Sequence, residues 1–305
     1  MAVPVVDAPA CEYDVVDVFA DAPFAGNQLA VVHGAEGLAD GQLLALAREF
    51  GYSETTFPTP TGPAAYDVRI FTPSGEIPFA GHPTLGTAWV LRHRGDVSGA
   101  ELVQTCAAGE IDVRFGGDAV QLSAAPRDLS GPVRSEDLGP VLADLGLTRG
   151  ALAGEAWLAG AGLTFLHLPV TEEAVVAAHP GRTPMAELLT APDLADLFEG
   201  INLVAVLPGD VTGDPVRVHA RVFVPGLSAD EDPATGSAAV GLGMALAASG
   251  LLPDGGSYEI RQGLEMGRPS RLHGRVEASA GVPTRVHVAG RVFAVASGTI
   301  AVPRG

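Results

Sequence analysis

The chain has 305 residues, of which 47% are apolar, so it is long enough to build a large hydrophobic core. Acidic residues outnumber basic ones by 36 to 18, and no basic cluster occurs, which excludes nucleic acid as a partner. All eighteen basic residues are arginine, so a lysine Schiff base and a P-loop lysine are both excluded.

Only two cysteines occur, Cys11 and Cys106, and they are far apart and in no metal-ligand spacing. They indicate neither a disulfide framework nor a zinc cluster, and they fit a reducing cytoplasm. The first residues combine acids and proline where a signal peptide has a basic start and an apolar core. No run of about 18 apolar residues follows. We therefore expect a cytoplasmic protein without a membrane partner, with a loose tail before Tyr13.

Hydrophobic periodicity predicts mostly antiparallel, curved sheets with three clear helices. The two later helices are poor in charge after their first turn, so strands are expected to surround each of them. In chain order the pattern predicts strands at 13–20 and 27–34, a helix at 39–50, a strand at 66–72, a helix at 84–93, strands at 101–106, 110–115, 164–170, 201–208 and 216–224, a helix at 235–249, and strands at 257–263, 273–279, 284–290 and 291–302.

One motif occurs twice in the chain. RIFTPSGEIPFAGHPTLGTAWVL begins at Arg69, and RVFVPGLSADEDPATGSAAVGLGMAL begins at Arg221. Each copy is a strand, a loop and the opening of an apolar helix, which predicts two similar α/β lobes with a cleft between them. The Pro/Gly-rich stretch 126–140 is the expected linker. The predicted boundaries are 12–127 for the first lobe and 128–291 for the second, with the last strand, about 292–303, as a candidate to complete the first.

The helix openings of this repeat predict an anion site. His82 matches Asp232, and Gly86 matches Gly236, each pair 150 positions apart. Asp232 and Pro233 are interpreted as the N-cap and first residue of the second helix. Free N–H groups and the helix dipole attract an anion to such a start, and Gly236 lets a ligand approach the backbone. Two facing starts therefore predict a bound carboxylate.

A single acid, Glu54, lies in the stretch GYSETTFP after the first helix. A glutamate in such a short polar cluster can be part of a solvated turn. A cleft between two lobes would instead desolvate it and raise its pKa toward neutrality, which suits a group that gives and takes a proton.

Six stretches in order resemble the phenazine-biosynthesis PhzF-like family, whose fold is that of diaminopimelate epimerase. They are VDVFADAPFAGNQLAVV, SETTF, FTPSGEIPFAGHPTLGTA, RVFVPGLSADEDPATGSAA, IRQGLEMGRPSRL and VHVAGRVFAVASGTI, and they run from about Asp14 to about Val302. The resemblance implies an α+β fold of two pseudo-symmetric lobes, each a curved, mostly antiparallel sheet or barrel around a central helix. It also implies an active site between the lobes and a homodimer.

The resemblance further implies the roles of individual residues. The glutamate of SETTF is the acid/base that shuttles a proton, and further polar positions of the active site match GHPT, EDPATG and TGSA. Two glycines match positions whose backbone lies against the substrate. The implied catalytic residues are Glu54, His82 and Asp232, and the implied substrate-binding residues are Gly81, Gly236 and Ser237.

The chain departs from the family pattern at two places. Gln28 stands where the family usually has proline, and Ala289-Gly290 replaces a late Gly-Gly. Neither change touches the polar positions of the implied site. The departures do not change the expected type of reaction, but they put the identity of the substrate in doubt.

Four other kinds of site or activity are compatible with parts of the sequence. A two-thiol racemase fails because Cys11 and Cys106 do not match in the repeat, and Cys106 is expected to be a buried structural thiol. The candidate ligands for a metal site are one histidine and two carboxylates. Transition-metal sites more often combine several histidines or thiolates. A non-catalytic small-molecule binding protein and an epimerase of the same fold stay open. We predict a cofactor-free isomerase that moves a proton within a small, cyclic, unsaturated carboxylic acid.

Overall fold

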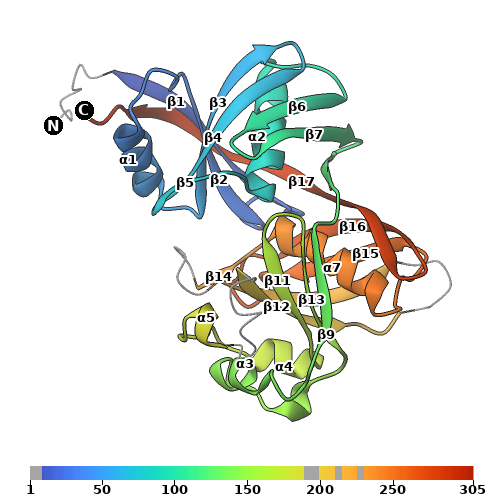
Figure 1. The fold of residues 1–305 in the computed structure, drawn as a ribbon. Coiled ribbons are helices and arrows are strands. Elements are labelled where there is room, and N and C mark those ends of the chain that lie inside the picture. Colours follow the sequence, from blue (N-terminus) through green and yellow to red (C-terminus); the bar gives the residue numbers. More distant parts are fainter. Residues whose placement is uncertain (1–8, 189–198, 210–214, 225–229, 305) are drawn as a thin grey trace.

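The computed structural model describes residues 9–188, 199–209, 215–224 and 230–304. The seventeen strands in this part of the chain form one continuous hydrogen-bonded sheet, which curves into two lobes joined by a long strand, β17 (Val282–Ala301) (Figure 1). Both ends of the described chain lie at the same end of the first lobe, because β1 and β17 run side by side there. The expected α+β architecture of two pseudo-symmetric lobes is confirmed.

The first lobe is made by the N-terminal elements, which curve around one central helix, α2. Its elements are β1 (Ala10–Val18), β2 (Asn27–His33), α1 (Asp40–Phe50), β3 (Glu54–Gly62), β4 (Ala65–Thr72), β5 (Gly75–Ile77), α2 (Gly81–Arg94), β6 (Glu101–Cys106), β7 (Gly109–Gly116) and β8 (Ala119–Ala124).

The second lobe repeats this plan around the helix α7. Its described elements are β9 (Asp128–Val133), α3 (Gly139–Asp144), a 3₁₀ turn (Arg149–Ala151), β10 (Ala156–Gly160), β11 (Thr164–Pro169), α4 (Glu172–Ala177), α5 (Met185–Leu188), β12 (Gly200–Val206), β13 (Val216–Phe223), β14 (Glu231–Asp232), α7 (Gly236–Ala248), β15 (Gly256–Gln262) and β16 (Ser270–Ser279).

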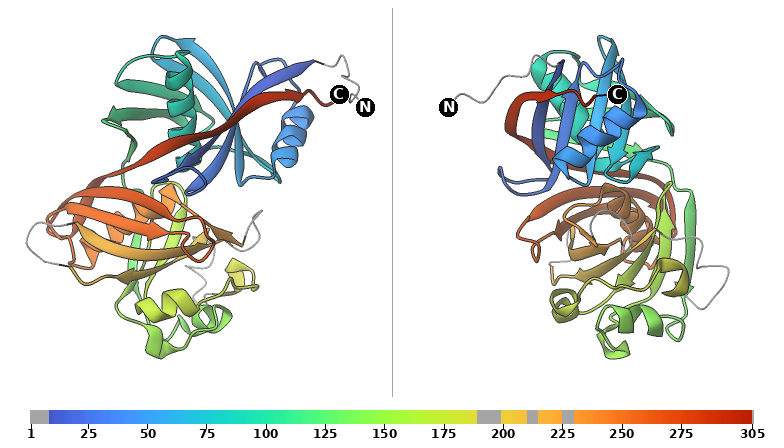
Figure 2. Two further views of the ribbon diagram at one scale, coloured as in Figure 1. Left: turned by 180° about the vertical axis from the view of Figure 1, so that it is seen from behind. Right: turned by 90° about the vertical axis from the view of Figure 1, so that its left-hand side faces the viewer.

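Strand pairing shows that the two lobes have the same connectivity. Each contains two parallel pairs, β2 with β3 and β4 with β6 in the first lobe, β11 with β12 and β13 with β15 in the second. Parallel neighbours need a crossover, and the crossovers that carry α2 and α7 place these helices inside the curved sheets. Figure 2 shows the second lobe from two further directions, with its strands curved around the helix α7.

The strand β17 belongs to both lobes. Its first half pairs with β16 and β8, and its second half pairs with β1. The prediction of two strands, at 284–290 and 291–302, was wrong because Gly290 continues the strand instead of ending it. A Cβ at Gly290 would lie 2.3 Å from Phe19 Cδ1, so the glycine makes room for a buried ring.

The predicted tail before Tyr13 also needs correction in its described part. Residues 10–12 belong to β1, where Cys11 pairs with Ile300 and is only 4% exposed. The other cysteine, Cys106, ends β6 and is half-buried, whereas a buried thiol was expected. Residues 1–8 lie outside the described part of the chain.

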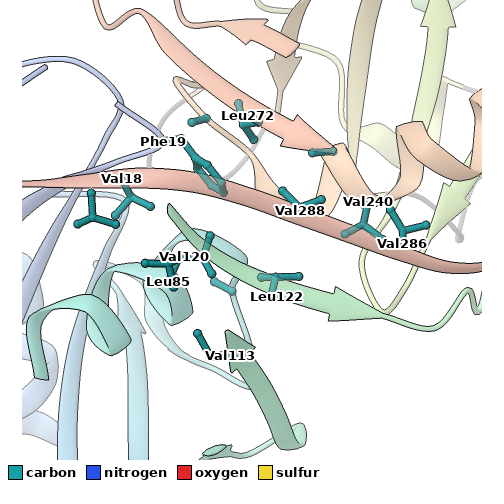
Figure 3. Close-up of a cluster of buried hydrophobic side chains, with 14 of the residues drawn as sticks. Val18, Phe19, Leu85, Val113, Val120, Leu122, Val240, Leu272, Val286 and Val288 are labelled. Atoms are coloured by element: carbon teal, nitrogen blue, oxygen red, sulfur yellow. The ribbon is translucent and has the colours of Figure 1, made fainter. Parts of the chain in front are cut away.

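Both central helices are buried along most of their length, as predicted. One hydrophobic cluster runs through both lobes, and Figure 3 shows side chains of this cluster, among them Val18, Leu85 and Val240, lying along β17. Glycine allows the closest approaches: a Cβ at Gly243 would lie 2.5 Å from the Tyr258 hydroxyl. No helix in the described residues combines the length and hydropathy that a bilayer crossing requires.

Two local predictions differ from the structure. Helix α7 begins at Gly236 with Thr235 as its N-cap, so Asp232 and Pro233 lie before the helix instead of capping it. The stretch 126–140, expected as a linker, contains β9, which pairs with β10. In both cases strand pairing overrode a local signal: Asp232 pairs with Val222 of β13.

Candidate functional site

A cavity of about 220 Å³ lies between the two lobes, where the helices α2 and α7 begin. It is lined by elements of both lobes, including the start of β3, the segment before α2 and the short strand β14. All six residues named from the sequence line this cavity: Glu54, Gly81, His82, Asp232, Gly236 and Ser237. The structure therefore brings together residues that lie far apart in the chain.

Glu54 is the first residue of β3, and its side chain is 16% exposed. Its Oε2 atom is buried and has no hydrogen-bond partner among the described residues. Burial raises the pKa of Glu54 to about 7, although a hydrogen bond from the Ser53 side chain acts in the opposite direction. A carboxyl with this pKa can both accept and return a proton near neutral pH.

His82 is the second residue of α2 and is 4% exposed. Its Nε2 atom lies 3.4 Å from Glu54 Oε2, and like that oxygen it has no hydrogen-bond partner in the described chain. Burial lowers the pKa of His82 to about 4, while the charge of Asp232 and a hydrogen bond to the Gln28 backbone act to raise it. The imidazole is therefore neutral at pH 7. Two unpartnered buried polar atoms on one wall mark where a polar ligand belongs.

Asp232 lies in β14, on the opposite lobe from Glu54 and His82. Burial raises the pKa of Asp232 to about 6, and the nearby Glu54 adds to this rise. Hydrogen bonds from Thr235 and Asn27 and the charge of His82 act in the other direction. Since Asp232 Oδ2 accepts from Thr235 Oγ1 at 2.6 Å and Oδ1 accepts from Asn27 Nδ2 at 2.8 Å, the carboxylate is held in one orientation.

Asn27, which sequence reasoning did not single out, connects the lobes. It begins β2 and is 2% exposed. Besides its bond to Asp232, its Nδ2 lies 3.0 Å from the Ala234 carbonyl oxygen and 3.3 Å from His82 Nδ1. An amide nitrogen has only two protons, so the two nearer oxygens take them. The His82 ring also has a hydrogen bond to the Gln28 backbone, and its Nε2 atom faces Glu54.

A second support, also missed from the sequence, lies behind Asp232. Gln262 of β15 donates from Nε2 to the Asp232 carbonyl oxygen at 2.8 Å and to Thr235 Oγ1 at 3.1 Å. Its Oε1 accepts from the Thr235 backbone N–H. The only sequence signal for Asn27 and Gln262 was their place within two of the family-like stretches, GNQLAVV and IRQG.

The starts of α2 and α7 meet at the wall of the cavity. A Cβ at Gly81 would lie 3.3 Å from Gly236 Cα and 3.5 Å from Ser237 N, so a side chain there would shift the two backbones apart by a few tenths of an ångström. The structural match is therefore Gly81 with Gly236, whereas the sequence repeat had aligned Gly86 with Gly236. Ser237 is half-buried, and its first-turn N–H has no intrahelical acceptor. Two adjacent helix starts favour a bound anion.

The described residues contain no group of three or more His, Cys, Asp or Glu side chains arranged to hold a metal ion. Glu54, His82 and Asp232 thus converge on the cavity without forming such a group. The chemistry that this arrangement supports is proton transfer, because two carboxyls with raised pKa values and a neutral imidazole share one small cavity.

A family model, curated relatives and solved structures all match this chain over most of its length. Residues 16–298 match the family model described as phenazine biosynthesis-like protein. The chain is 36% identical over 294 residues to trans-2,3-dihydro-3-hydroxyanthranilate isomerase from Pseudomonas chlororaphis, covering 94% of this chain and 98% of the relative. The solved structure of a PhzF-family phenazine biosynthesis protein from Bacillus anthracis has a TM-score of 0.83 at 22% identity, covering 96% of this chain and 100% of that one.

A solved hydroxyproline epimerase from Agrobacterium vitis shares the fold at a TM-score of 0.60 and 16% identity, over 96% of this chain and 93% of that one. The fold and the relatives define an isomerase with the two-lobed architecture that epimerases also use. The chain belongs to the phenazine biosynthesis-like family, the PhzF-like proteins.

Proposed function

We propose that this chain catalyses a proton shift within an unsaturated, cyclic carboxylic acid, using side chains and no cofactor. The Pseudomonas chlororaphis relative is named for such an acid, trans-2,3-dihydro-3-hydroxyanthranilate. The proposal depends on one observation above all: the buried, unpartnered Glu54 Oε2 lies 3.4 Å from His82 Nε2, in a cavity whose wall includes two helix starts.

In this proposal Glu54 is the proton carrier. A carbon–hydrogen bond of the substrate breaks as Glu54 takes the proton, the double bond moves along the ring, and Glu54 returns the proton to a second carbon. The formula and the oxidation state stay unchanged. A pKa of about 7 suits both steps, because neither protonation state of Glu54 is strongly favoured at neutral pH.

The other residues of the cavity bind and orient the substrate. The carboxylate lies at the helix starts, near Gly81, Gly236 and Ser237, where backbone N–H groups and dipoles stabilise negative charge. His82 accepts a hydrogen bond from a polar group of the substrate through Nε2. Asp232, fixed by its two donors, orients a second polar group.

One observation favours an alternative, an epimerase with two bases. Asp232 lies on the opposite lobe from Glu54, and its pKa is raised to about 6. A second acid/base across the cavity would deliver a proton to the opposite face of the substrate. A non-catalytic binding protein would keep the cavity and exchange no proton.

The test is turnover in D₂O after exhaustive EDTA treatment, with trans-2,3-dihydro-3-hydroxyanthranilate as the first substrate and NMR as the readout. We expect isomerised product with at most one deuterium per turnover, on the face from which the proton left. Glu54→Gln should lose about 10²–10⁴-fold in rate. Deuterium on the opposite face would support the two-base epimerase, and turnover by Glu54→Gln at the wild-type rate would refute the assignment of Glu54.

The oligomeric state and the cellular location of the chain are two further predictions. A homodimer, implied by the resemblance to the family, is tested by light scattering of the purified chain. A cytoplasmic location is tested by cell fractionation.

A further inference from the structure

A second cavity, of about 400 Å³, adjoins the proposed catalytic cavity. The two share the residues Pro78, Phe79, Gly81, Leu163, Gly236 and Ser237 in their walls. Since Ser237 and both glycines face both cavities, a ligand held at the helix starts has space on either side. The proposed proton shift uses only the smaller of the two.

The chemistry of the second cavity differs from that of the first. The smaller cavity is lined by three acids, Glu54, Glu199 and Asp232. The larger one is lined mostly by apolar and small side chains, and its only charged lining residue in the described chain is Arg127. An apolar group would fit its interior, and an anion would be attracted to its one cation.

Arg127 is placed for such a role. Its backbone N–H donates to the Gly160 carbonyl oxygen at 3.3 Å, which fixes the segment between β8 and β9 against β10. Its guanidinium has no hydrogen bond or ion pair with any described residue, although the chain carries twice as many acids as bases. Nine of the eighteen arginines pair with a carboxylate in the described part of the chain, as Arg221 does with Glu231 and Arg291 with Asp118.

We propose that the two cavities form one binding site for a substrate with two acidic ends. The reacting acid lies at the helix starts, an apolar body extends past Phe79 and Leu163 into the larger cavity, and a second carboxylate binds Arg127. This inference deepens the proposed function and rests on it for the position of the reacting acid. It assigns to this chain a longer, dianionic substrate.

The test measures binding and not turnover, so that it is independent of the reaction. Two probes of matched shape are titrated calorimetrically at pH 8: 1,4-phenylenedipropionate, with two carboxylates, and 3-(4-ethylphenyl)propionate, with one. The wild type should bind the diacid up to about fivefold more tightly, since Arg127 is exposed and water screens an exposed ion pair. Arg127→Gln should remove that advantage and leave the affinity for the monoacid unchanged.

Two further variants test where the probes bind. Arg182→Gln removes an exposed arginine that lines neither of the two cavities, and it should leave both affinities unchanged. Ala125→Trp adds bulk at an exposed position of the larger cavity wall, and it should weaken both probes. The inference is overturned if the wild type binds the two probes equally or binds neither, if Arg127→Gln weakens both alike, or if Arg182→Gln has the same effect.

The outcomes also separate this inference from the proposed function. Diacid binding that depends on Arg127, together with no deuterium exchange into any tested acid, would contradict the proton shift and support the binding site. Exchange without any diacid preference would support the proton shift and overturn the two-ended substrate.

Discussion

Asn27 Nδ2 of the first lobe lies 2.8 Å from Asp232 Oδ1 of the second, so one buried amide joins the two halves of the site. The Oδ1 atom of Asn27 in turn lies 3.3 Å from Ser53 Oγ, next to Glu54. A single side chain thus connects the segments that carry both carboxyls. Its removal should affect chemistry more than folding.

Asn27→Ala removes a donor that stabilises the ionised form of Asp232. We expect the pKa of Asp232, already raised to about 6, to rise further, so the ascending limb of the pH profile of kcat/KM moves to higher pH. The loss of about 1.5–3 kcal/mol predicts a fall in kcat/KM of roughly 10- to 100-fold. Gln28→Ala changes the other face of β2 and is the control. A lower rate with an unshifted profile would mean that Asn27 only supports the fold.

Glu54→Gln should stabilise the protein at alkaline pH. The folded-state pKa of about 7 lies above the ordinary value of 4.5, so the wild type loses stability as pH rises from about 4.5 to 7. Glutamine does not titrate and therefore lacks this cost, which is at most about 3.4 kcal/mol. We expect the Tm difference between variant and wild type to be positive at pH 8 and to vanish near pH 4.5. Glu49→Gln, at an exposed site, should show no such pH dependence.

Gly81→Ala and Gly86→Ala should separate binding from packing. A methyl at position 81 would lie 3.3 Å from Gly236 Cα, at the helix starts, so we expect KM to rise by about tenfold or more with little change in Tm. A methyl at position 86 would lie 2.6 Å from Leu29 Cδ2 in the core. That overpacking should cost about 1–3 kcal/mol and lower Tm. Equal effects of the two changes on KM would argue against a ligand at the helix starts.

Glu231→Gln should be strongly destabilising. Arg221 is 5% exposed, and its Nε and Nη2 each donate to a Glu231 oxygen at 2.8 Å. Removing Glu231 leaves the buried guanidinium with one weaker ionic partner, Glu265 Oε2 at 3.9 Å, at a cost of about 3 kcal/mol in the free energy of unfolding. Chemical denaturation measures this. The matched control is Glu76→Gln, whose partner Arg69 is exposed, and it should cost at most about 1 kcal/mol.

Much of the architecture was predictable because it is encoded locally. Alternation and helical periodicity indicated the three main helices and eleven of the strands, and the repeated motif indicated two similar lobes. Six strands were not predicted, among them β3 (ETTFPTPTG), β8 (AVQLSA) and β10 (AWLAG). The two prolines of β3 are a local signal against a strand, which the pairing of the assembled sheet overcomes. The six residues named from the family-like motifs all line one cavity, although their roles stay predictions.

The tertiary structure alone decided which residues meet. Asn27 and Asp232 are 205 positions apart, and no local pattern predicts their hydrogen bond. Asp232 has the sequence of a helix cap, but its pairing with β13 places it before the helix and turns its carboxylate toward Asn27 and Thr235. The periodicity of a strand or helix depends on neighbours a few positions away. A raised pKa depends instead on burial between two lobes, which only the assembled fold provides.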